Sequence, residues 1–380
     1  MSANPYEDRE QTEVKHRILE RYLEAFAPIV GSWAADIAYV DCLAGPWRSA
    51  SPTLTDTSFA RAIGTLRQAR LALRLRGKTP SFRCLLIELD VVAFRRLEEY
   101  GAAVEDVEVT TKHWDFAAHI PEIVAFAKER RNSFPFIFID PTGWELATID
   151  LIRPLLQLNP GEVLINLMTS WITRFLSDPS KGFDRLFGQE EVERIRSLPA
   201  EQQEEELVRT YAGAVRRAGG FKYVCNLPVM KPDQDAFHFH MVYGTRHEKG
   251  VEVFKSMEQT VIPFMHRTRA AAQARRRLER TSQPGLFGAE ATYREQKFSL
   301  LRQNNLAAAK SAVAAMLERQ ADTLYDDIWA ESMQYAAVME EDVRNWIDEW
   351  DKQGKIKIEN MQAGRRVVQR GKNITLHRLS

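Results

Sequence analysis

The sequence lacks a net charge and a cysteine framework. Its 52 basic residues are balanced by 52 acidic ones, which excludes a protein that attracts nucleic acid through its overall field and leaves only a local basic patch for that purpose. The three cysteines, Cys42, Cys84 and Cys225, lie in separate apolar segments, without the paired spacing of a zinc site or of disulfides. We therefore expect buried thiols in a reducing compartment and no metal site.

Long hydrophobic runs are also missing. No segment approaches the roughly 18 consecutive apolar residues of a membrane helix, and the N-terminal stretch "MSANPYEDREQTEVKH" is polar. With 380 residues, of which 44% are hydrophobic, the chain is long enough for two domains or for one domain with an appendage. We expect a cytoplasmic protein without a membrane partner.

Short apolar segments alternate with amphipathic stretches from about residue 10 to residue 260, which indicates strands joined by crossover helices. Five segments are apolar on both faces, as central parallel strands are: residues 37–43, 82–89, 107–111, 134–140 and 161–168. Two more, 221–229 and 237–245, are too close together for a helical crossover and predict an antiparallel hairpin. The pattern predicts an α/β fold with a doubly wound, mostly parallel sheet that ends in an antiparallel hairpin, similar to class I, S-adenosylmethionine-dependent methyltransferases.

A basic segment follows this first domain, which we place at residues 1–262 together with an N-terminal helix. We expect residues 263–297 to form a basic helix and linker, because the stretch "RTRAAAQARRRLERTSQPGLFG" contains six arginines: Arg267, Arg269, Arg275, Arg276, Arg277 and Arg280. A solvated helix face and a segment that contacts phosphates both fit this pattern. In the second case Arg275, Arg276 and Arg277 are the expected contacts to nucleic acid.

Residues 298–380 predict a further domain. Helical segments near 298–320, 324–333 and 340–354 precede short alternating strands, an order typical of a winged helix-turn-helix. Its helix "EEDVRNWIDEWDK" is acidic, which argues against reading of the DNA major groove by that helix. The domain either contacts nucleic acid through the wing, with Arg365 and Arg366, or binds protein.

Polar residues follow the first three predicted strands at their carboxyl ends, where open α/β sheets bind ligands. The first strand ends in "VDCLAGPW", which holds an acid and small residues but only one glycine, and is therefore weaker than a glycine-rich nucleotide loop. The second ends in "IELD", with an acid where doubly wound folds bind ribose hydroxyls, and the third in "KHWDF", with an acid and a ring suited to adenine. The expected cofactor contacts are Asp41, Leu43, Ala44, Gly45, Glu88, Asp115 and Phe116.

The fourth strand ends in "FIDPTGW". Here Asp140, Pro141 and Gly143 form a rigid turn that can present a carboxylate and backbone carbonyls to a substrate amine. Each of these strand-end acids, taken alone, also fits a helix N-cap or a surface turn. Because acids recur at four strand ends in register, we favour a nucleoside-like ligand site.

Other polar residues have simpler interpretations. Lys15 and His16 lie on an amphipathic N-terminal helix that either covers the pocket or presents a solvated face, and the solvated face is favoured. His238 and His240 alternate along a predicted strand without an evident carboxylate or cysteine partner, so we expect histidines packed in the sheet rather than metal ligands.

Two of these motifs resemble signatures of the three-Cys-motif partner protein family. "VDCLAGPW" resembles its "DxFAGPG" signature and "FIDPTGW" its "DPfG" signature, and "TEVKHRILERYL" is similar to the family's N-terminal helix with a lysine. The similarity extends over nearly the whole chain, including the winged helix. It implies a methyltransferase-like Rossmann domain in a bacterial protein, encoded beside a partner that carries a three-cysteine, radical-enzyme-like motif.

The resemblance also implies roles for individual residues. It implies a nucleoside-binding role for Asp41, Ala44 and Gly45, and a catalytic or substrate-facing role for the "DPTG" turn. Leu43 stands where the family has phenylalanine and Trp47 where it has glycine, so we expect a more closed loop after the first strand.

Two functions remain open at this point. In the first, the chain binds S-adenosylmethionine and methylates an amine of a nucleobase or of another nucleic-acid group, with Asp140 orienting the amine. In the second, a methyltransferase-like shell grips nucleic acid or a partner enzyme, and its nucleoside pocket is vestigial or serves for sensing. Polar residues of the kinds that a methyltransferase needs stand at four strand ends, which favours the enzyme. The loop after the first strand has only one glycine, which favours the binding module.

Overall fold

The computed structural model describes residues 5–46, 49–281, 295–320, 322–361 and 367–379. Its centre is a seven-stranded sheet with the order β3-β2-β1-β4-β5-β7-β6, the order of class I methyltransferase-like folds. The strands are β1 (Asp36–Asp41), β2 (Ser81–Glu88), β3 (Glu108–His113), β4 (Ser133–Ile139), β5 (Glu162–Leu167), β6 (Tyr223–Met230) and β7 (Phe237–Thr245). Strands β1 to β5 are parallel and β7 is antiparallel to both of its neighbours, so the predicted parallel sheet and terminal hairpin are confirmed.

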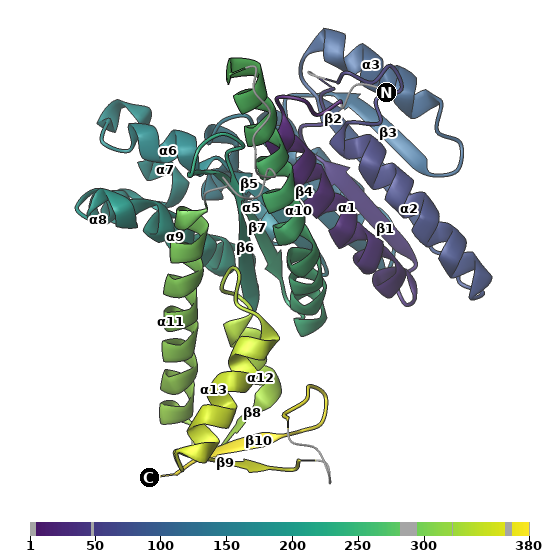
Figure 1. Cartoon of the computed structure of the whole chain (residues 1–380). Helices are drawn as coiled ribbons and strands as arrows, with labels where there is room; N and C mark the ends of the chain where they lie inside the picture. Colours follow the sequence, from purple (N-terminus) through teal and green to yellow (C-terminus); the bar gives the residue numbers. More distant parts are fainter. Residues whose placement is uncertain (1–4, 47–48, 282–294, 321, 362–366, 380) are drawn as a thin grey trace.

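Helices cover both faces of this sheet (Figure 1). Successive residues of β1 point to opposite faces, so Tyr39 packs in one apolar cluster and Val40 in the other. The first cluster lies under α1 (Glu10–Gly31), α2 (Ser58–Leu75), α3 (Val91–Ala102) and α10 (Glu248–Thr281). The second lies under α4 (Ile120–Lys128), α5 (Ile149–Leu156), α6 (Thr169–Phe175), α7 (Asp184–Phe187), α8 (Gln189–Arg196) and α9 (Ala200–Gly219). Short 3-10 turns η1 (Ala117–His119), η2 (Glu145–Ala147) and η3 (Pro179–Lys181) complete the connections.

Helix α10 crosses the expected domain boundary at residues 262 and 263 without interruption. Met265 and Arg269, beyond that boundary, are buried against the hairpin of β6 and β7, where Arg269 donates to the carbonyl oxygens of Lys231 and Gln234. The beginning of the basic segment is therefore part of the first domain: Arg269 is buried in it, whereas Arg267 and Arg280 are exposed and Arg275, Arg276 and Arg277 are half-buried. None of the helices that the structure describes is long and apolar enough to cross a membrane.

The C-terminal unit consists of three helices and a small sheet. Helices α11 (Gln296–Arg319), α12 (Tyr325–Ser332) and α13 (Glu340–Lys352) pack beside a three-stranded antiparallel sheet formed by β8 (Asp322–Leu324), β9 (Ile356–Glu359) and β10 (Thr375–Arg378). Figure 1 shows this small sheet at the end of the molecule away from the N-terminus.

Buried polar contacts dock the C-terminal unit on the large domain. The side-chain oxygen of Gln334 accepts from the backbone N–H of Val224, 3.2 Å away, on the edge strand β6. In α10, the buried ion pair of Lys255 and Glu258 reaches the connection between α12 and α13, where Lys255 donates to the carbonyl of Tyr335 at 3.2 Å and Glu258 accepts from the N–H of Ala337. Because unpaired buried charges are costly, these contacts fix the unit in one position.

A glycine in α10 makes room for a buried polar cluster. Glu162 accepts from the hydroxyls of Tyr22 at 2.6 Å and Thr245 at 2.8 Å, and Tyr22 also bonds Tyr243 at 2.5 Å. A Cβ atom on Gly250 would lie 2.7 Å from Glu162 Oε1 and closer still to the Tyr243 hydroxyl. A side chain at Gly250 would therefore break up this cluster.

We expect Gly250→Ala to destabilise the protein by about 1 to 3 kcal/mol, as overpacking of a buried site does. The matched control is Gly64→Ala, because a Cβ atom at Gly64 in the interior of α2 meets nothing within 4 Å. This substitution removes a glycine from a helix and should increase the stability of the protein by about 0.5 to 1 kcal/mol. Urea unfolding of both variants measures the difference. A Gly250→Ala protein as stable as the parent would contradict the packing described.

Candidate functional site

Four neighbouring strands end in polar residues at one edge of the sheet. In the order β2-β1-β4-β5, the strand ends carry Glu88, Asp41, Asp140 and Asn166. The three acids were predicted from the sequence to lie at this edge. In open α/β sheets, ligands bind beyond the carboxyl ends of the parallel strands.

Asp41 is fully buried at the end of β1. Its carboxylate accepts from the Ser58 hydroxyl at 2.8 Å, from the backbone N–H of Leu43 at 3.3 Å and from the Tyr39 hydroxyl at 3.3 Å. Burial, together with the charge of the nearby Asp140, raises the pKa of Asp41 to about 7. An acid held in this way at a cost in stability is typical of a functional site.

Asp140 lies between an amine and an amide. Its Oδ2 atom is 2.5 Å from the ammonium of Lys15, which comes from α1, and its Oδ1 accepts from the side-chain N–H of Asn166 at 2.7 Å. The expectation of a solvated face for Lys15 was wrong, because the side chain is only 15% exposed and its charge is satisfied by Asp140. His16 is buried as well, and its ring nitrogen Nδ1 bonds the hydroxyl of Tyr6 at 3.0 Å.

Asn166 was missed in the sequence, although it lies within the predicted fifth strand. A carboxylate oxygen of Asp140 can only accept, so the side-chain amide of Asn166 must point its N–H group toward Asp140. The other end, Oδ1, is buried and has no hydrogen-bond partner among the described residues. A buried acceptor without a donor is costly and marks a position at which a ligand can donate.

Glu88 ends β2 next to exposed apolar side chains. Its Oε1 atom accepts from the N–H of Asp90 at 2.6 Å, and Asp90 in turn caps the N-terminus of α3. Directly beside this buried acid, Leu89 is 61% exposed, and Val91 and Val92 are exposed too. Glu88 could accept from the hydroxyls of a ribose, and the apolar side chains beside it could contact the flat ring of an adenine. Together they match the two parts of an adenosine. The apolar residues were not singled out in the sequence, where "LDVV" reads as the entrance to a helix.

The loop after β1 is tied to its neighbours by backbone bonds. The N–H of Ala44 donates to the carbonyl of Ile87 at 2.7 Å, and Ala44 is buried, whereas Leu43 and Gly45 are half-buried. The N–H groups of Leu43 and Ala44 are therefore engaged within the protein. Trp47, the residue expected to close this loop further, lies outside the described residues.

The remaining predicted residues lie in two turns. Asp115 is exposed and accepts from the N–H of Ala117 at 2.9 Å, while Phe116 is 2% exposed within the second apolar cluster. In the turn after β4, Pro141 is buried and Gly143 half-buried. The adenine-covering role of Phe116 and the substrate-facing role of the turn stay predictions, and Phe116 contributes to the core as the structure stands.

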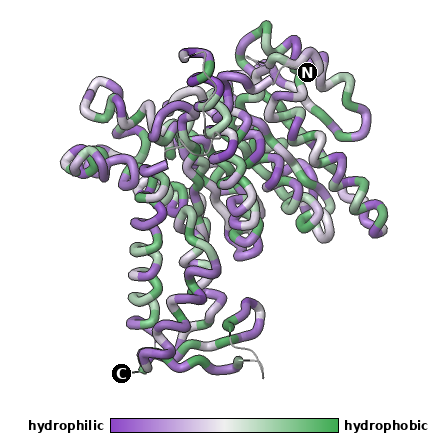
Figure 2. Tube along the Cα trace, viewed as in Figure 1, coloured by the Kyte–Doolittle hydropathy of each residue, from purple (hydrophilic) through white to green (hydrophobic). Residues whose placement is uncertain are grey.

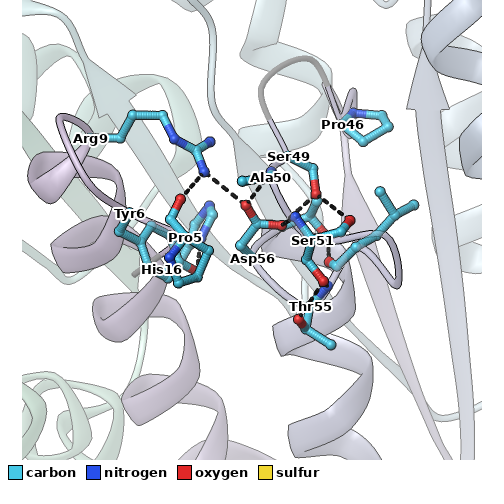
Figure 3. Close-up of polar contacts among 12 residues, drawn as sticks. Pro5, Tyr6, Arg9, His16, Pro46, Ser49, Ala50, Ser51, Thr55 and Asp56 are labelled. Carbon is cyan, nitrogen blue, oxygen red and sulfur yellow. Dashed lines mark hydrogen bonds and ion pairs between the residues drawn. The ribbon is translucent and has the colours of Figure 1, made fainter. Parts of the chain in front are cut away.

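Hydrogen bonds and an ion pair connect the N-terminal segment before α1 to the loop that follows β1 (Figure 3). Arg9 donates to Asp56 at 2.7 Å and to the carbonyl of Pro5 at 2.5 Å. Asp56 also accepts from the N–H of Ala50 at 2.8 Å and from the Ser49 hydroxyl. The start of the chain is therefore held near the sheet edge at which Lys15 of α1 reaches Asp140.

The arginines predicted to contact phosphates differ in their surroundings. Arg275 and Arg276 form ion pairs with carboxylates of the N-terminal segment, whereas none of the described carboxylates pairs with Arg277. Arg365 and Arg366 lie outside the described residues.

Comparison with known proteins gives distant structural neighbours only. No protein-family model matches the chain, and no curated protein matches its sequence. A Legionella pneumophila protein of the DUF519 family has a TM-score of 0.38 at 12% identity, over 68% of this chain and 92% of its own. A loganic acid methyltransferase with S-adenosylhomocysteine has a TM-score of 0.31 at 10% identity, over 76% and 92%. At these scores the assignment of the fold depends on the strand order alone.

Substitution of Asp41 should change the pH dependence of stability. The folded chain keeps the Asp41 proton up to about pH 7, whereas the unfolded chain releases it near pH 3.8, so stability falls as pH rises through this window. Asp41→Asn keeps the shape and removes the titration. We expect the stability of the variant relative to the parent to increase by about 3 kcal/mol between about pH 5 and about pH 8, measured by urea unfolding. If the unfolding free energies of parent and variant changed in parallel with pH, the pKa of Asp41 would not be raised in the folded protein.

Proposed function

We propose that this chain is an S-adenosylmethionine-binding methyltransferase that methylates an amine of a nucleic acid. The observation that carries the proposal is Asp140, held between Lys15 and the partly unsatisfied amide of Asn166 at the carboxyl edge of a class I methyltransferase-like sheet. This edge is where ligands of such sheets bind.

The residues of the edge fit the cofactor chemically. Glu88 can accept from ribose hydroxyls, and exposed Leu89 beside it can cover adenine. Asp41 is fully buried and would have to be uncovered to accept from the amino group of the methionine part. The cofactor, when bound, supplies a methyl group on a positively charged sulfur, which acids at this edge would stabilise.

The substrate amine would be oriented by this chain's own side chains. Asp140 accepts one N–H and stabilises the positive charge that develops on the nitrogen during transfer. Asn166 Oδ1, which has no donor among the described residues, accepts a second N–H. Two acceptors select a primary amine and fix the direction of its lone pair. In this role Lys15 must leave Asp140 when the substrate enters, since its ammonium now occupies that carboxylate.

The C-terminal unit supports a nucleic-acid substrate by its topology. The order of α11, β8, α12, α13, β9 and β10 is that of a winged helix. Its α13 begins with Glu340, Glu341 and Asp342, so contacts to phosphates would come from the wing rather than from this helix.

The resemblance to three-Cys-motif partner proteins adds a second component. We propose that the chain works beside a protein with a three-cysteine, radical-enzyme-like motif. The motifs "VDCLAGPW" and "FIDPTGW", whose acids lie at two neighbouring strand ends, support this assignment.

One observation favours a non-catalytic binding module instead. The 2.5 Å ion pair of Lys15 and Asp140 fills the position proposed for the substrate amine, and a shell that only binds nucleic acid or a partner would keep this pair permanently closed. The two functions differ in what Asp140 does, so a substitution at this residue separates them.

Asp140→Asn keeps the shape and some hydrogen bonding but removes the charge. In the enzyme we expect affinity for the cofactor within about threefold of the parent, a difference of roughly 0.7 kcal/mol, because Glu88 and Asp41 bind most of it. Methyl transfer should fall by about 10² or more. The assay is transfer of labelled methyl groups to mixed cellular DNA, RNA and protein.

The control is Asp150→Asn, since Asp150 is an exposed aspartate of α5 that pairs only with Arg153 among the described residues. It should transfer at the parent's rate. If the parent itself labels none of the three substrates, with or without the neighbouring partner protein, the chain is the binding module.

A further inference from the structure

Two arginines near the C-terminal end of α10 are covered by acids of the N-terminal turn. Arg275 Nη2 lies 2.9 Å from Asp8 and 2.7 Å from Glu10, and its Nε lies 3.4 Å from Glu7. Arg276 Nη2 lies 3.3 Å from the same Asp8 oxygen. Carboxylates thus surround two adjacent guanidinium groups in the way that successive backbone phosphates do.

The neighbouring arginines have no such cover. None of the described carboxylates pairs with Arg267, Arg277 or Arg280 of the same helix. Figure 2 shows the C-terminal end of α10 as mainly hydrophilic, and Figure 1 shows it at the same end of the molecule as the start of α1. Arg267, Arg277 and Arg280 therefore extend the basic surface beyond the two covered residues. Two further exposed acids pair with these two residues more distantly, Glu279 with Arg275 at 3.6 Å and Asp233 with Arg276 at 3.5 Å.

We infer that the acidic turn of Glu7 and Asp8 occupies a binding site for the phosphate backbone of nucleic acid on Arg275 and Arg276, and competes with it. This inference rests on the nucleic-acid part of the proposed function. It assigns a position to the substrate strand, which would enter along α10 toward the edge where Lys15 pairs with Asp140.

The exposure of the acids makes them replaceable. Glu7 is 48% and Asp8 72% exposed, whereas Glu10 is almost fully buried. Exposed ion pairs contribute little to stability and are screened by salt, while a strand of phosphates gains from the release of its counterions. Glu10 and the bond from Arg9 to Asp56 can keep the segment attached while Glu7 and Asp8 give way.

The test removes the competing charges without removing the turn. Glu7→Gln with Asp8→Asn neutralises both acids, and asparagine suits residue 8 because its φ is 60°, in the left-handed region that asparagine tolerates. We expect this double variant to bind a fluorescent single-stranded DNA oligonucleotide about threefold to tenfold more tightly than the parent, as expected for the loss of three surface ion pairs. The control is Asp106→Asn with Glu108→Gln, which neutralises two exposed acids that pair with Arg67 and Arg130 near β3.

A second variant tests the arginines. Arg275→Gln with Arg276→Gln should weaken binding and lower the slope of log K against log salt by about 1.4, as for two phosphate contacts to a single strand. Equal affinity of parent and acid variant, an equal gain in the control, or an unchanged salt slope would overturn the inference. Calorimetry with S-adenosylhomocysteine on the same proteins reports separately on the cofactor site, so a failure of that assignment is distinguishable from a failure here.

Discussion

The placement of two carboxylates side by side, away from water, is the constraint on which the site depends. Asp41 and Asp140 end adjacent parallel strands, and burial together with the charge of Asp140 raises the pKa of Asp41. One acid is relieved by Lys15 and Asn166, and the other keeps its proton up to about pH 7. Helix α1 must therefore lie across this edge, and the contacts of the N-terminal segment with the loop after β1 and with α10 hold it there.

A site of this kind is polarised for a cation. In the proposed reaction the methyl donor carries a positive sulfur and an amino group, and the methylated amine gains positive charge, so the acids of this edge would suit both. The same arrangement explains why Lys15 is paired with Asp140 in this structure, since its ammonium neutralises the carboxylate. The acids at the N-terminal turn neutralise the arginines of α10 in an analogous way.

Much of the fold could be predicted from local sequence, and much of the site could not. Seven apolar segments with turn residues between them identified all strands of the large sheet, and "VDCLAGPW" and "FIDPTGW" located Asp41 and Asp140. The sequence predicted that the third strand ends at residue 111, but β3 ends at His113. The last two residues belong to the strand because they pair with β2 up to Glu88, and local composition does not encode this pairing. Lys15 read as solvated because its partner is 125 residues away in sequence, and Asn166 looked like an ordinary strand residue until its unsatisfied oxygen was seen. Contacts between distant segments decide both.

The central claim is that the edge formed by β2, β1 and β4 binds the nucleoside of S-adenosylmethionine. Isothermal titration calorimetry with S-adenosylhomocysteine tests it most directly, on the parent and on Glu88→Gln, which retains an acceptor for the N–H of Asp90. We expect one saturable site in the parent, and an affinity about tenfold lower in the variant through loss of a charged hydrogen bond to ribose. Absence of heat and of a thermal shift in the parent, or equal affinity of the two proteins, would contradict the claim.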